Sequence, residues 1–128
     1  MRIGHDDNYL SIELRQLDGA CVSWLVEAGA SFSGGEFRAS HDHILASSSP
    51  EDIEQFDHFA SSGASGYELT ITEGGWLRLS RDSRGYITVQ YRLASRRATA
   101  AMEGDVIVEG EFAGDFCRQL RLLLTSQS

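Results

Sequence analysis

The sequence predicts a single α+β domain (residues 1–128), in which an antiparallel sheet of about six or seven strands carries two helices on one face. A chain of 128 residues is long enough for one domain with its own core. Short segments alternate apolar and polar residues between glycine-containing turns, as antiparallel strands do. Two other segments repeat apolar residues at helical spacing, and runs of strands precede each of them, which favours α+β.

The first third of the chain is predicted to form a hairpin followed by irregular extended chain. Residues 1–8 are mostly polar, so we expect them to be flexible. Tyr9–Leu14 alternates leucine and isoleucine with tyrosine, serine and glutamate, and Cys21–Glu27 alternates again after a turn signal. The Phe32–Phe37 run fits either a tight turn or a bulged strand. We favour one bulged strand, followed by a short strand at 43–45.

A helix is predicted next, because its start signal is the clearest local pattern in the chain. Ser49 can cap the first amides, Pro50 suits the first helical position, and acidic residues follow in the first turn. Ile53, Phe56 and Phe59 then form an apolar stripe at helical spacing. The helix should end at the small residues that follow position 60.

The remaining chain is predicted to form a meander of strands and a closing helix. Strands are expected over 67–72, 76–80 and 86–93, with another inside Ala98–Val108 whose boundaries stay open. The closing helix is expected over Glu111–Leu124. The residues expected to be buried are Ile53, Phe56, Leu69, Ile71, Leu77, Leu79, Ile87, Val89, Phe116 and Leu120.

Composition and charge argue against several classes of partner. The net charge is −8, from 19 acids and 11 bases that are all arginine, which argues against nucleic acid and anionic membrane. No run of about 20 apolar residues occurs, so we expect no membrane span, and the polar start shows no leader pattern. We therefore expect a cytoplasmic protein. Cys21 and Cys117 are expected to be buried thiols, with a disulfide between them as the open alternative.

No cofactor, metal or catalytic residue is expected from the motifs. His41-Asp42-His43 puts two imidazoles on one strand face, but a zinc site needs three or four ligands and no second cluster is present. No Gly-x-Ser-x-Gly elbow and no phosphate-binding loop occur. The sequence therefore leans against an enzyme.

The charge map indicates a candidate partner-binding face. Residues 1–75 carry 13 acids and three arginines, whereas residues 76–97 carry one acid and six arginines. Alternation places Trp76, Arg78, Tyr86 and Arg92 on the polar face of this basic meander, and tryptophan and arginine are enriched where proteins bind proteins. A merely solvated sheet face is the plainer interpretation.

A rival partner surface lies on the predicted first helix, whose acidic face carries Glu51, Glu54 and Asp57. An acidic surface gains association rate when its target is basic, as many nuclease toxins are. The same acids also suit a helix start and a solvated helix face.

Several of these segments resemble one known family. They are Trp24-Leu25-Val26-Glu27, Phe32-Ser33-Gly34, Gly66-Tyr67, Leu77-Arg78-Leu79-Ser80 and Arg84-Gly85-Tyr86-Ile87-Thr88-Val89, with the closing helix. From about Trp24 to Leu124 the chain resembles small bacterial WapI-type immunity proteins and related families of unknown function. The resemblance implies a strand pair, a short helix, a hairpin and a C-terminal helix, in a cytosolic protein that neutralises a polymorphic toxin by binding it. It carries over no catalytic residue, and the sequence departs from the pattern around Ala98–Asp105.

Three functions therefore remain as hypotheses. The leading one is a protein-binding module, and in its sharper form an immunity protein that neutralises a bacterial toxin by stoichiometric binding. The alternatives are an enzyme with an unmarked active site and a self-associating structural domain. The sequence leaves the partner and the oligomeric state open.

Overall fold

The computed structural model describes residues 1–16, 22–32, 35–44, 50–61, 64–72, 75–94 and 101–125. Over these residues the chain forms two antiparallel sheets of four strands each, with two helices. The first sheet contains β1 (Arg2–His5), β2 (Asn8–Gln16), β3 (Val22–Phe32) and β4 (Gly35–Ile44), and helix α1 (Pro50–Ala60) follows it. The second sheet contains β5 (Gly66–Thr72), β6 (Gly75–Arg81), β7 (Ile87–Ala94) and β8 (Ala101–Val108), and helix α2 (Gly110–Thr125) closes the described chain.

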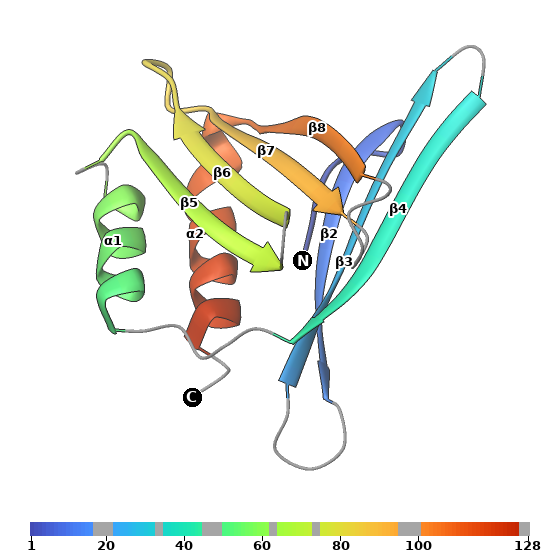
Figure 1. Ribbon diagram of the computed structural model, residues 1–128. Coiled ribbons are helices and arrows are strands. Elements are labelled where there is room, and N and C mark those ends of the chain that lie inside the picture. The colour runs from blue at the N-terminus through green and yellow to red at the C-terminus, as the bar shows by residue number, and fades with distance from the viewer. Residues whose placement is uncertain are drawn as a thin grey trace.

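The α+β class is confirmed, but the prediction of a single sheet of six or seven strands is wrong. Each sheet is a meander in which consecutive strands pair, in the orders β1-β2-β3-β4 and β5-β6-β7-β8. Helix α1 separates the two meanders in the chain, and β5 begins a new sheet instead of pairing with β4 (Figure 1). Alternation could not predict this division, because it reports which face of a strand is buried and not which strands are neighbours.

Two further differences concern the first sheet. Residues 1–8, which the sequence predicts to be flexible, contain β1, and the Met1 amino group donates to the Ile12 carbonyl at 2.8 Å. The single bulged strand favoured around Phe32–Phe37 is also wrong. The residues on either side form two strands, in which Phe32 pairs with Gly35, and Ser33 and Gly34 lie outside the described residues.

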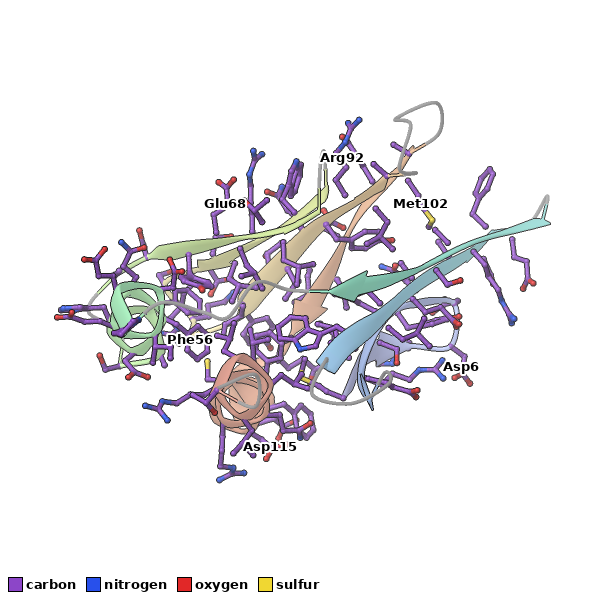
Figure 2. The ribbon with its side chains drawn as sticks, turned by 60° about the horizontal axis from the view of Figure 1, so that its bottom comes forward. Asp6, Phe56, Glu68, Arg92, Met102 and Asp115 are labelled. Atoms are coloured by element: carbon purple, nitrogen blue, oxygen red, sulfur yellow. The ribbon has the colours of Figure 1, made fainter. Side chains whose placement is uncertain are left out.

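The core lies between the two sheets and the helices. Both helices cover the same face of the second sheet, and Figure 2 shows Phe56 pointing from α1 into the space beneath that sheet. Trp24 of β3, which is fully buried, joins the same cluster from the first sheet. Leu77 and Leu79 are 2% and 3% exposed, which confirms the predicted facing of the meander strands.

Most of the other core predictions also hold. Phe56, Ile87, Val89, Phe116 and Leu120 are buried. Ile53 and Leu69 are only partly buried, and the side chain of Ile71 lies outside the described part of the chain.

The two helices begin close to the predicted positions. Helix α1 starts at Pro50 as expected, and its proposed cap, Ser49, lies outside the described residues. On α2, Phe116 is 4% exposed and faces the core, whereas Phe112 is 57% exposed. Within the described chain, neither helix has the length and apolar character that a membrane-spanning helix needs.

Candidate functional site

The candidate site is the outer face of the second sheet, which we call the docking face. It consists of the side chains of β5–β8 that point away from the helices. Strand register arranges the central positions in three cross-strand rows. The rows are Thr70, Trp76, Arg92 and Glu103; then Glu68, Arg78, Gln90 and Asp105; then Gly66, Ser80, Thr88 and Ile107.

Trp76 and Arg78 form a stacked pair on this face. The Arg78 guanidinium lies 3.9 Å from the centroid of the Trp76 ring. Arg78 Nε also donates to Glu68 Oε2 at 3.2 Å, across the β5–β6 pairing. The carboxylate and the ring together hold one guanidinium, so these side chains are ordered before any partner arrives.

Arg92 extends the face on the next strand. It lies directly opposite Trp76 in the β6–β7 register, and its Nη1 donates to Glu103 Oε1 of β8 at 2.7 Å. Figure 2 shows Arg92 and Glu68 on the same side of the sheet, away from the helices. The structure therefore brings Trp76, Arg78 and Arg92 together, as alternation predicts.

Tyr86, the fourth predicted residue, lies apart from these three. It precedes β7 in the turn after β6, and its amide donates to Asp82 Oδ1 at 3.0 Å. The Arg84 guanidinium lies 4.4 Å from the centroid of its ring, and Gly110 at the start of α2 lies against the ring. The structure places this tyrosine at the end of the sheet, beside α2.

The docking face is close to neutral, although the stretch that supplies its centre is basic. Of the six arginines in residues 76–97, only Arg78 and Arg92 belong to the three rows. The same rows contain three acidic residues, Glu68, Glu103 and Asp105. Arg81 instead turns toward α1, where its Nη1 donates to the Phe59 carbonyl at 2.8 Å; Arg96 and Arg97 lie outside the described residues. Sequence reasoning missed the three acids because they lie on β5 and β8, outside the basic stretch, and only the strand register shows that their side chains stand opposite its arginines.

The fold also pairs one acidic residue of the rival surface on α1 with an arginine of α2. Glu51 and Glu54 are exposed, but Asp57 is partly buried and accepts from Arg121 of α2, with 2.8 Å between Asp57 Oδ1 and Arg121 Nε. The hydrogen bond from Arg121 holds the pKa of the Asp57 carboxyl below its usual value. One of the three predicted acids is therefore already paired within the molecule.

A cleft opens between the inner faces of the two sheets, at the end away from the helices. Its volume is about 1260 Å³. Phe37 and Ala39 of β4 line one wall, while Tyr91, Leu93 and Met102 of β7 and β8 line the other, and Figure 2 shows Met102 in this space. Burial raises the pKa of the Tyr91 hydroxyl, so at neutral pH it is protonated and is not a base. The cleft can accommodate an apolar side chain of another molecule.

The histidines and cysteines that the sequence analysis considered add no further site among the described side chains. Among the side chains that the structure describes, no three histidine, cysteine or acidic groups gather as metal ligands would. The side chains of His41, Asp42 and His43 lie outside that part of the chain, as does Cys21. Cys117 is a free, buried thiol whose pKa is raised by burial, which makes it a poor nucleophile.

Comparisons with known protein families, with curated proteins and with solved structures found no match for this chain. The similarity to WapI-type immunity proteins therefore stays a prediction.

Proposed function

We propose that this chain is a protein-binding module and that the docking face carries its partner. The observation that supports this most directly is the stack of Arg78 on Trp76, held by Glu68. Tryptophan and arginine contribute most often to the binding energy of protein interfaces. Holding them in place before binding reduces the entropy lost when a partner orders them.

Neighbouring side chains suit the same role. Arg92 and Glu103 form a second ordered ion pair beside Trp76, and Ile107 at the opposite corner is 56% exposed. A rigid, nearly neutral surface of this kind favours a partner whose contact surface is also mixed in charge. In its sharper form the partner is a bacterial toxin domain, which the chain neutralises by stoichiometric contact.

The docking face is preferred to the acidic surface of α1 on one observation. Asp57 already binds Arg121, so the α1 surface keeps fewer charges for a basic partner. The two surfaces also differ in salt dependence. Association through α1 should slow steeply with salt, because exposed charges are screened beyond about 8–10 Å. Association through the docking face should change little, because its charges nearly balance.

Co-purification from the source cell, followed by affinity measurements with the recovered protein, tests the proposal. Trp76→Ala should weaken binding by about 2 kcal/mol or more, mainly through faster dissociation. Phe112→Ala, which removes an exposed ring of α2 outside the docking face, is the matched control, and reversal of Glu51 and Glu54 tests the rival surface. Failure to recover any partner, or full affinity of Trp76→Ala, would show the assignment to be wrong.

A further inference from the structure

Strand β4 is an edge strand with a long unpaired side. It ends the order β1-β2-β3-β4, and no described strand pairs with it on the side away from β3 (Figure 1). It has 10 residues, which is longer than the usual strand of about 5–6. An exposed edge presents unpaired N–H and C=O groups that another strand can bind.

The register shows which backbone groups face outward. The Ser31 amide donates to the Asp7 carbonyl at 2.7 Å, which continues the β2–β3 ladder. In an antiparallel strand alternate residues bond to opposite neighbours. Odd-numbered residues of β3 therefore bond to β2, and even-numbered residues bond to β4.

Phe37 of β4 pairs with Ala30, an even-numbered residue of β3, so its backbone groups bond to β3. The backbone N–H and C=O groups of its two neighbours, Glu36 and Arg38, consequently point away from β3 to the free edge. The free edge therefore offers two donors and two acceptors, one residue on each side of Phe37.

The side chains at this edge are complementary to a second copy of themselves. The Glu36 and Arg38 side chains are 59% and 67% exposed, and Phe37 between them is 62% exposed. In a two-fold antiparallel pair centred on Phe37, each Glu36 lies opposite the Arg38 of the other copy, and the two Phe37 rings meet. Pairs centred on Glu36 or on Arg38 would instead place like charges opposite each other, which is unfavourable.

We infer that this protein forms a two-fold dimer through β4, with Phe37 on the axis and an eight-stranded sheet running across both copies. Each Glu36–Arg38 pair then exchanges both backbone hydrogen bonds, and the ion pair that Arg38 Nε and Glu36 Oε1 form at 3.6 Å within each copy is joined by one between copies. Strand β4 is the last strand of the first sheet (Figure 1), so among the described strands none occupies the edge that the second copy would pair with. Glu36, Phe37 and Arg38 belong to the first sheet and Trp76 to the second, so the dimer does not depend on the docking face.

Sedimentation equilibrium of the full chain, from about 1 µM to about 1 mM, tests the dimer. We expect a reversible monomer–dimer equilibrium. Glu36→Arg alone and Arg38→Glu alone should each weaken it at least about tenfold, because each brings two like-charged pairs together. The double variant Glu36→Arg/Arg38→Glu should restore it, since the opposite charges are then exchanged.

A matched control comes from the exposed Asp115–Arg118 ion pair of α2. Asp115→Arg changes the net charge as Glu36→Arg does, and should leave dimerisation unchanged. Trp76→Ala should also leave it unchanged. A monomer throughout the concentration range, a folded double variant that stays monomeric, or a dimer lost in Trp76→Ala would each overturn the inference. A monomer–dimer equilibrium that is unchanged in Glu36→Arg and in Arg38→Glu would overturn it too.

Discussion

Tyr91 lies across the backbone of Gly104, its direct partner in the β7–β8 ladder. A Cβ atom at Gly104 would stand 2.5 Å from Tyr91 Oη and 2.7 Å from its Cζ, which is far inside contact distance. The first sheet repeats this arrangement, with the Tyr9 ring over Gly29 and the Tyr9 hydroxyl donating to Glu27 at 2.5 Å. In both sheets the missing side chain of a glycine makes room for a ring on the neighbouring strand.

Gly104→Ala should therefore destabilise the protein by about 1–3 kcal/mol, because the new methyl group would displace the buried Tyr91 ring from its place against the Gly104 backbone. Gly114→Ala is the matched control, since no atom lies within 4 Å of its Cβ position on α2. Alanine at that position should stabilise the helix by about 0.5–1 kcal/mol. Urea denaturation measures both, and equal stabilities of the two variants would contradict the close packing of Tyr91 on Gly104.

Phe116→Ala should reduce the free energy of unfolding by about 3–5 kcal/mol, because the ring is buried in the core and its removal leaves a cavity. Phe112→Ala, one turn earlier on α2, should cost less than about 1 kcal/mol because that ring is exposed. Thermal and urea unfolding of the pair provide the comparison. A Phe112→Ala loss as large as that of Phe116→Ala would mean that the wrong face of α2 has been assigned to the core.

The Asp57–Arg121 ion pair links α1 to α2 and should make stability depend on acid pH. The folded state lowers the pKa of Asp57 below its usual 3.8, through the hydrogen bond from Arg121. Its contribution is therefore present above that value and is lost as pH falls below it. Asp57→Asn should lower stability at pH 7 by about 0.2–1 kcal/mol, since the Asp57 and Arg121 side chains are about half exposed and water screens their interaction. The difference from the parent protein should vanish in acid, and a double-mutant cycle with Arg121→Gln isolates the pair.

Tyr67 should make the free energy of unfolding depend on alkaline pH. Here stability is lost as pH rises, whereas the contribution of Asp57 is lost as pH falls. Burial, reinforced by the charge of Asp52, raises its pKa from 10.0 to about 12. Below pH 10 the hydroxyl is protonated in both states, so it adds no pH dependence. Between pH 10 and 12 the unfolded state loses the proton first, and stability falls. Tyr67→Phe should remove about 1–2 kcal/mol of that fall, after allowance for solvent screening.

Tyr86→Phe is the control for Tyr67, because this ring lies at the end of the sheet and is only partly buried. Unfolding free energies at about pH 9 and about pH 11.5 are sufficient for the comparison. An unchanged alkaline slope in Tyr67→Phe would show that the buried hydroxyl is not responsible.

Local patterns were enough to predict the facing of individual elements. Alternation assigned Leu77 and Leu79 to the core and Trp76 and Arg78 to the opposite face, and the Pro50 signal located the start of α1. These predictions succeed because side chains alternate with a fixed period along a strand, and because a helix start needs particular residue types. Neither property depends on distant parts of the chain.

The sequence by itself determined the α+β class, the strand faces and the placement of Trp76, Arg78 and Arg92 on one face. Only the tertiary structure decided that the strands divide into two sheets, that Glu68 and Glu103 neutralise the arginines, and that Tyr86 stands apart. The physical reason is that strand pairing joins residues far apart in the chain through backbone hydrogen bonds, which are the same for every sequence. No local pattern of side chains therefore specifies which strands become neighbours.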